Sequence, residues 1–167
     1  MHAFLIELSR QRSYWLLLLL AGIALEGGAL YYQYVLDEWP CVLCIHVRIL
    51  VMGFLLLSAL ALFCTRSMPM MRLLHAINSL IMLWLVERSW QVLAVERGWI
   101  FGDCDMDLGM PAWFALDKWL PAVFEVQTSC GYTPIIIFDV TMAETLVVIS
   151  ALMLIISTVV FIASWLD

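Results

Sequence analysis

The chain contains 167 residues, of which 65% are hydrophobic, well above the roughly 45–50% apolar usage of soluble domains. This composition excludes an ordinary soluble globular domain and indicates a membrane protein. Eight Lys and Arg residues against fourteen Asp and Glu residues give a formal charge of −6, and the absence of a basic tract argues against nucleic acid as a partner.

Four apolar segments are each long enough to cross a bilayer as a helix, which takes about 20 residues. They are expected at about residues 14–36, 45–63, 73–93 and 144–166. The first is too long for the core of a cleaved signal peptide and has no small-residue cleavage site, so we expect it to remain as a span. The prediction is an all-α membrane protein, a single domain over residues 1–167 built as a bundle of four transmembrane helices.

The loops between these spans predict the topology. Residues 37–44 are too few to cross a membrane, so the first two spans form an antiparallel hairpin, and the long acidic loop of residues 94–143 lies on the same side as residues 37–44. The opposite side carries more basic residues: Arg10, Arg12, Arg66 and Arg72 against Arg97 and Lys118. By the positive-inside rule the termini are cytoplasmic and both loops lie outside, where disulfides persist.

This topology places four of the five cysteines outside. Cys41 and Cys44 lie in the first loop and Cys104 and Cys130 in the second. Cys64 lies at the inner end of the second span, where we interpret it as a small apolar filler. Cys104 and Cys130 can be a structural staple, since closing a ring of about 27 residues stabilises by roughly 3–4 kcal/mol, or the second of two redox pairs.

The stretch from Cys41 to Cys44 admits three interpretations. The four outer cysteines could bind zinc, although an oxidising compartment competes for their thiols and Cys104 and Cys130 are not a close pair. A structural disulfide is possible, but a ring across two residues is strained and therefore reducible. The pattern favours cycling between dithiol and disulfide, and the structural disulfide and the metal site stay open as alternatives.

The start of the second span favours a thiolate at Cys44, because the helix macrodipole and free N–H groups there stabilise an anion. Arg48 follows four residues later on the same helix face, about 6 Å deeper in the membrane. An arginine inside an apolar span is a functional-site hypothesis by default. The structural alternatives are that Arg48 extends back to the interface or pairs with Glu87. His46 is expected at the interface.

A dithiol that becomes oxidised must pass two electrons to an acceptor. The sequence contains neither a C-x-x-C-H haem motif nor a G-x-G-x-x-G nucleotide motif. A quinone dissolved in the bilayer needs only a crevice beside Cys44. Charged residues within the spans would line a pocket for such a polar-headed, lipid-soluble acceptor: Glu26, Arg48, Glu87 and Arg88.

A short interfacial helix is expected in the long loop. Its apolar residues share one helical face that can rest at the membrane surface: Trp113, Leu116, Leu120 and Val123. Pro121 would end its first part. Such a helix would keep Cys130 within reach of Cys41, although a plain membrane anchor explains the pattern equally well.

Together these features resemble the disulfide bond formation protein B family, the quinone-dependent thiol oxidases of the Gram-negative inner membrane. The resemblance covers nearly the whole chain and rests on the four spans, the Cys104 and Cys130 pair, and these segments: Pro40-Cys41-Val42-Leu43-Cys44 followed by Arg48, and Pro111 to Pro121 with Val123-Phe124. It implies a bacterial inner-membrane enzyme that reoxidises a periplasmic thioredoxin-fold dithiol oxidase. Its electrons would pass to ubiquinone or menaquinone, which sustains disulfide bond formation.

The resemblance also implies roles for the four cysteines. The reduced partner would attack the Cys104–Cys130 disulfide and form a mixed disulfide at Cys104. Cys130 would then exchange with Cys41, which frees Cys44 as the thiolate that interacts with the quinone.

Three further residues match family positions near the quinone: Arg48, Glu26 and Met142. No metal ligand set is implied. Two departures concern this site, because residues 92–103 contain no histidine and residues 133–137 contain no tryptophan, where the best-known member has both. Gln91, Glu96 and Arg88 are the candidate replacements for the histidine.

Two other functions compete with this interpretation. A quinone-epoxide reductase-like enzyme uses a similar constellation, but that family carries its cysteine pair on a late helix. A non-enzymatic tetraspan protein with structural disulfides or a metal site would need no quinone. A variant that retains only Cys104 among the outer cysteines separates these cases, since only the thiol oxidase should capture a thioredoxin-fold partner covalently.

Overall fold

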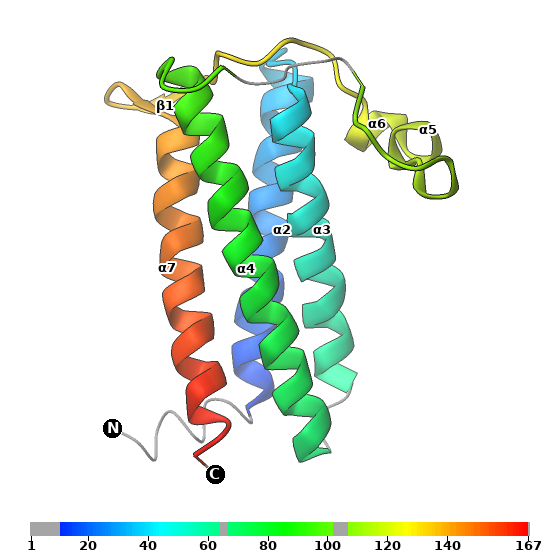
Figure 1. The fold of residues 1–167 in the computed structure, drawn as a ribbon, viewed down its shortest axis with the longest axis vertical. Coiled ribbons are helices and arrows are strands. Elements are labelled where there is room, and N and C mark those ends of the chain that lie inside the picture. The colour runs from blue at the N-terminus through cyan, green and yellow to red at the C-terminus, as the bar shows by residue number, and fades with distance from the viewer. Residues whose placement is uncertain (1–10, 64–66, 102–106, 167) are drawn as a thin grey trace.

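The structure, a computed structural model, describes residues 11–63, 67–101 and 107–166. Its long helices are α2 (Arg12–Val35), α3 (Val42–Phe63), α4 (Met68–Glu96) and α7 (Met142–Ala163). All four are long and apolar enough to cross a membrane, which confirms the expected four-helix membrane fold. The start of α2 and the end of α7 lie at the same end of the bundle (Figure 1).

The most extensive helix contacts follow chain order, and α2 also touches α4 where the Trp15 ring stacks on His75 with centroids 4.9 Å apart. α2 packs on α3, α3 on α4, and α4 on α7, whereas within the described residues α2 and α7 are not a closely packed pair. Gly22 permits the close approach of α2 and α3, since a Cβ there would lie 2.8 Å from Leu55 Cγ. Inside the α4–α7 interface, Asn78 Nδ2 donates to Ser157 Oγ at 2.9 Å, a typical interhelical bond where water is absent.

The helix boundaries differ from the expected spans at the start of α3 and α4. α3 begins at Val42 rather than near residue 45, which places Cys44 in its first turn. α4 begins at Met68 rather than near residue 73, because Pro69 falls in the first turn, where its missing N–H costs nothing. α7 begins with a capping box in which Thr141 Oγ1 accepts from Glu144 N and the Glu144 carboxylate accepts from Thr141 N.

The loop segment expected to form one interfacial helix forms three short pieces: η1 (Ala112–Phe114), α5 (Leu116–Trp119) and α6 (Pro121–Phe124). Ala115 (φ −90°, ψ 78°) and Leu120 (φ −136°, ψ 64°) interrupt the helix. The expected apolar face is divided as a result: Leu116 and Val123 pack against the core, while Trp113 is 77% exposed. The pieces project sideways beyond α3 (Figure 1).

A small antiparallel hairpin, which the sequence did not suggest, precedes α7. It consists of β1 (Ile135–Ile137) and β2 (Val140–Thr141). Its turn places Phe138 (φ 48°) and Asp139 (φ 62°) in the left-handed region, which costs energy for residues other than glycine. The hairpin projects from the end of the bundle on the side of α7 (Figure 1).

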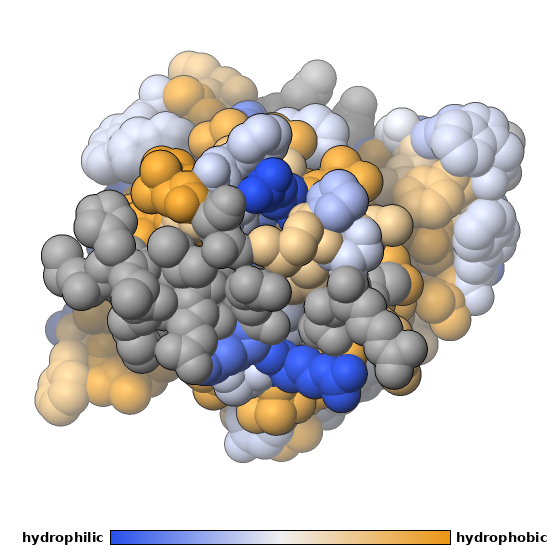
Figure 2. Space-filling view, turned by 90° about the horizontal axis from the view of Figure 1, so that it is seen from below, coloured by the Kyte–Doolittle hydropathy of each residue, from blue (hydrophilic) through white to orange (hydrophobic). Residues whose placement is uncertain are grey.

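The end of the bundle where α2 begins is seen in Figure 2, where hydrophilic surface forms small areas among apolar ones. Arg72, near the start of α4, donates from Nε to the Ser164 carbonyl at 2.9 Å. Its guanidinium lies 5.4 Å from the ring centroid of Trp165. Arginine beside tryptophan is typical of a membrane interface.

Candidate thiol and quinone site

Cys41 and Cys44 lie at the N-terminus of α3. Ile45 N donates to the Cys41 carbonyl at 3.0 Å, the first hydrogen bond of the helix. Cys44 N donates to Cys41 Sγ at 3.3 Å, so the Cys41 sulfur occupies the place of an N-cap acceptor. Both sulfurs therefore lie where free N–H groups and the helix dipole stabilise negative charge.

Backbone pairing brings the long loop to Cys41. Gln127 N donates to the Pro40 carbonyl at 3.0 Å, and Thr128 forms an isolated parallel β-bridge with Cys41. The side chains of Cys41 and Cys130 are hydrogen-bonded to each other. The two loops thus meet at a pair of cysteine side chains.

Three of the four cysteines expected to act together, Cys41, Cys44 and Cys130, are therefore gathered at one place. Cys41 lies in the middle, with hydrogen bonds to both Cys44 and Cys130. Cys104 lies outside the described residues, as does Cys64, so the roles expected for both stay predictions.

The environment of Cys41 determines where its proton is held. The hydrogen bond with Cys130 lowers the pKa of Cys41, but the hydrogen bond to Cys44, burial and the negative charge of Cys44 outweigh this effect and raise the pKa from 9.0 to about 12. In the fully reduced protein Cys41 consequently keeps its proton at neutral pH.

The strap of residues 128–133 carries Cys130 and is fixed at both ends. At one end Thr128 pairs with Cys41. At the other, Thr133 is 6% exposed and its Oγ1 donates to the Glu96 carboxylate at the end of α4. Between them Gly131 has a φ of 117°, a conformation that other residues rarely adopt. The position of Cys130 is thereby tied to both ends of the strap.

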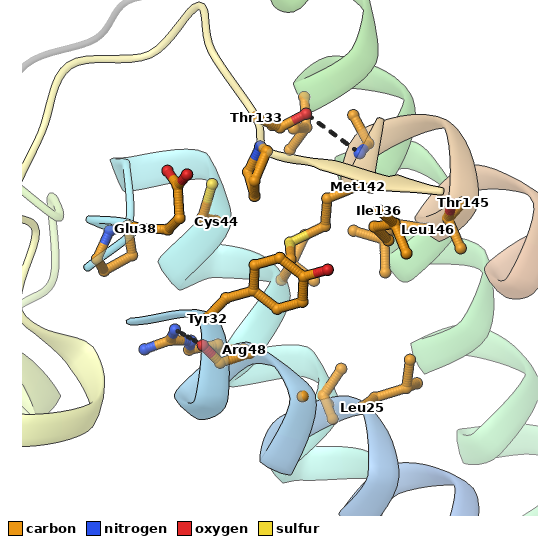
Figure 3. A pocket seen from close by; sticks show the side chains of 18 of the residues that line it. Leu25, Tyr32, Glu38, Cys44, Arg48, Thr133, Ile136, Met142, Thr145 and Leu146 are labelled. Carbon is orange, nitrogen blue, oxygen red and sulfur yellow. Dashed lines mark hydrogen bonds between the residues drawn. The ribbon is translucent and has the colours of Figure 1, made fainter. Parts of the chain in front are cut away.

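A cavity of about 230 Å³ opens beside Cys44. The residues predicted near the quinone all line it: Cys44, Arg48, Glu26 and Met142. Cys44 and Arg48 reach it from α3, and Met142 reaches it from the start of α7 (Figure 3). Its remaining walls are mostly apolar and come chiefly from α2, α3, α7 and the two loops before α3 and α7, including Leu25, Leu146 and Ile149. The cavity therefore lies between the membrane-spanning helices and the loops that precede α3 and α7.

Arg48 is held by three acceptors at the wall of this cavity. Its Nη1 donates to Gln33 Oε1 at 2.6 Å and to the Val123 carbonyl at 2.8 Å, and its Nη2 donates to the Ala29 carbonyl at 3.1 Å. The side chain is 5% exposed. It therefore does not extend back to water, and its acceptors are neutral oxygens of α2 and the long loop.

The alternative pairing of Arg48 with Glu87 is wrong. Glu87 forms an ion pair with Arg88 at 3.3 Å, and neither residue lines the cavity. His46 also lies apart from the cavity, with its Nε2 3.3 Å from the Leu108 carbonyl. Of the charged residues proposed for the pocket, only Glu26 and Arg48 are brought together.

Glu26 gives the cavity an unsatisfied polar group. Its side chain is 7% exposed, and Oε1 has no hydrogen-bond partner within the described residues. Arg48 is the charged group that acts on it electrostatically. A mostly apolar cavity with a few convergent polar groups is the usual form of a small-molecule site, and these residues fit a ring with polar oxygens and an apolar tail.

Tyr132 and Glu38 contact each other across the two loops at the edge of the cavity, which both line. Tyr132 Oη donates to Glu38 Oε1 at 3.3 Å. The negative charge of Glu38 raises the pKa of Tyr132, so the phenol keeps the proton that it donates.

Sequence reasoning missed Gln33 and Gln127. Gln33 is 6% exposed near the end of α2, and its Nε2 donates to Gln127 Oε1 at 3.0 Å. A polar side chain inside an apolar span was the available signal for Gln33. The candidate replacements for the histidine, Arg88, Gln91 and Glu96, do not line the cavity.

Comparison with known proteins agrees with this geometry. The family model "Disulfide bond formation protein DsbB" matches residues 11–160. Disulfide bond formation protein B of Photorhabdus laumondii is 32% identical over 99% of this chain and 98% of its own. The protein of that name from Yersinia pestis (strain Pestoides F) is 34% identical over 97% of this chain and 92% of its own. The protein of that name from Shewanella sp. (strain W3-18-1) is 33% identical over 91% of this chain and 87% of its own. The chain therefore belongs to the DsbB family, and it is a multi-pass membrane protein that forms disulfide bonds.

Proposed function

We propose that this protein oxidises the dithiol of a periplasmic thioredoxin-fold partner and transfers the electrons to a membrane quinone. In this proposal it lies in the bacterial inner membrane with its termini in the cytoplasm. Arg12 and Arg72 at the end of the bundle where α2 begins support this orientation. The redox loops then face the oxidising side, where thiol oxidation is useful.

The proposed exchange begins at the long loop. A partner thiolate attacks Cys104 of a Cys104–Cys130 disulfide, which forms a mixed disulfide and releases Cys130 as a thiolate. Cys130 attacks Cys41 of a Cys41–Cys44 disulfide, which forms the Cys41–Cys130 bond and releases Cys44 as a thiolate. The second partner thiolate then displaces Cys104 and leaves the partner oxidised.

The remaining exchange restores the loop disulfide. Cys104 attacks Cys130, which re-forms the Cys104–Cys130 bond and returns Cys41 to the thiol state. Two electrons and two protons that came from the partner now reside on Cys41 and Cys44. Arg48, Glu26 and Met142 would hold a quinone, which would supply the two-electron, two-proton acceptor that re-formation of the Cys41–Cys44 disulfide requires.

One observation carries the proposal: Cys130 hydrogen-bonds to Cys41, while Cys44, in the next turn, lines the cavity with Arg48. The sulfur pair thus connects loop thiol chemistry with a cavity between the membrane-spanning helices. A structural staple would explain the first contact but not the second.

Quinol formation tests the proposal directly. Purified protein, a reduced thioredoxin-fold dithiol oxidase and ubiquinone-1 should give one quinol per partner disulfide formed, followed by the change in quinone absorbance. Cys44→Ser should abolish quinol formation, while Cys64→Ser, the matched control, should retain it. Quinol formation by Cys44→Ser at the parental rate would refute the proposed route.

A further inference from the structure

We propose that Gln33 is a positioning residue that links the cavity to the thiol exchange site. Gln33 accepts from Arg48 Nη1 at 2.6 Å and donates to Gln127 Oε1 at 3.0 Å. Its side chain is 6% exposed. One amide therefore uses both its acceptor and its donor in contacts to different halves of the site.

The first contact fixes the Arg48 guanidinium. Arg48 has three acceptors within the described contacts, and two of them are backbone carbonyls: Val123 and Ala29. Gln33 gives the shortest of the three bonds. Because a planar guanidinium needs acceptors in fixed directions, loss of this one should leave Arg48 less well oriented at the cavity wall.

The second contact fixes the loop strand that leads to Cys130. The side chain of Gln127 accepts from Gln33, and its backbone N–H donates to the Pro40 carbonyl, next to Cys41. Thr128 follows and pairs with Cys41. Gln127 is thereby held from two sides, three residues before Cys130.

The inference extends the proposed function, on which its quinone part rests. A displacement of the strand at Gln127 would be transmitted through Gln33 to Arg48, and the reverse also holds. The approach of Cys130 to Cys41 and the orientation of Arg48 beside Cys44 are in this way coupled through the two hydrogen bonds of one amide.

Disulfide trapping tests the loop side. The background chain carries Cys44→Ser, Cys64→Ser and Cys104→Ser, so that diamide can join only Cys41 to Cys130. Gln33→Leu and Gln127→Leu should each slow this reaction about three- to tenfold, as expected for the loss of one hydrogen bond of ordinary strength. The double variant should be no slower than the slower single variant, because both remove the same contact.

Quinone kinetics test the other side in the chain with all its cysteines. Gln33→Leu should raise the quinone KM about three- to tenfold, while Gln127→Leu leaves it within about twofold of the parent. Gln91→Leu is the matched control, since Gln91 bonds to Glu87 and does not line the cavity. It should change neither measurement.

The inference is overturned if Gln33→Leu traps at the parental rate, if it leaves the quinone KM unchanged, or if Gln91→Leu slows trapping equally. Far-UV circular dichroism verifies that the variants fold. Gln127→Leu serves as a second variant, because Gln127 lies in a loop and its substitution leaves the helices unchanged. If the parent chain reduces no quinone, the proposed function fails, whereas the trapping measurement still decides whether Gln33 positions the loop.

Discussion

Thr128 pairs with Cys41 through the backbone, two residues before Cys130 in the sequence. The Thr128 N–H donates to the Pro40 carbonyl at 3.4 Å. The pairing therefore depends on the main chain at this position and not on the threonine side chain. This distinction separates two substitutions of Thr128.

Thr128→Pro removes the N–H donor and should slow diamide-driven joining of Cys41 to Cys130 about tenfold. Thr128→Ala keeps the donor and should remain within about twofold of the parent. Both rates are measured in the background that retains only these two cysteines, by mass spectrometry after thiol labelling. Equal rates for the two variants would show that the bridge does not bring the thiols together.

Arg48 should affect quinone use more strongly than its charge alone explains. Arg48→Lys keeps the charge but loses the planar fork that reaches three acceptors. We expect the quinone KM to rise about tenfold in Arg48→Lys and further in Arg48→Ala, which corresponds to roughly 1.4 kcal/mol or more. Steady-state turnover at varied quinone and saturating partner measures this. An unchanged KM in Arg48→Ala would remove Arg48 from the site.

Cys41 should be an unusually poor nucleophile in the reduced protein. Its pKa is raised to about 12, so at pH 9 only about one molecule in a thousand carries the thiolate, against half for an ordinary cysteine. Iodoacetamide alkylation of Cys41, followed by peptide mass spectrometry, should therefore keep rising with pH beyond 10. Steric shielding alone would lower the rate but leave its midpoint near pH 9, and a midpoint there would contradict the raised pKa.

The fold and the cysteine site could largely be predicted because both depend on features of short sequence segments. Apolar segments of membrane length require helices, and a short first loop requires the hairpin of α2 and α3. The Cys41 and Cys44 spacing and the charge of Arg48 within an apolar span are likewise visible without a structure. Met142 was predicted only from the family resemblance, and it lines the same cavity as Cys44, Arg48 and Glu26.

The parts that were missed depend on contacts between distant residues. Gln33 acquires its place only because Gln127, 94 positions later, lies beside it. The hairpin before α7 could not be predicted, because its turn places Phe138 and Asp139 in left-handed conformations. The Gly or Asn that usually indicates such a turn is missing there. Glu87 was a reasonable partner for Arg48 by depth alone, but it lies on α4 and pairs there with Arg88.

Gly22 should be essential for the packing of α2 on α3. A Cβ at this position would lie 2.8 Å from Leu55 Cγ and 3.0 Å from Phe54 Cε1, so Gly22→Ala should lower the free energy of unfolding by about 1–3 kcal/mol. Gly27→Ala, with nothing within 4 Å of the added Cβ, is the matched control and should not destabilise. Unfolding in SDS followed by circular dichroism measures both, and Leu55→Ala should rescue Gly22→Ala. Equal stability of the two alanine variants would contradict the close approach.

Glu26 should lower the stability of the fold while it strengthens quinone binding. Its Oε1 is buried without a hydrogen-bond partner in the described part of the chain, and such a group costs about 1–3 kcal/mol. Glu26→Leu should therefore raise the free energy of unfolding by about that amount. If the carboxyl faces a quinone oxygen, the same substitution should raise the quinone KM about tenfold, because the polar contact is lost.

Ser58 provides the matched control for these two effects. Its Oγ is also buried and without a partner among the described residues, but Ser58 does not line the cavity. Ser58→Ala should raise stability, by SDS unfolding, without changing the quinone KM. A stabilised Glu26→Leu with a parental KM would place Glu26 outside the quinone site. A destabilised Glu26→Leu would show that the attraction between the carboxylate and Arg48 outweighs the cost of the buried Oε1.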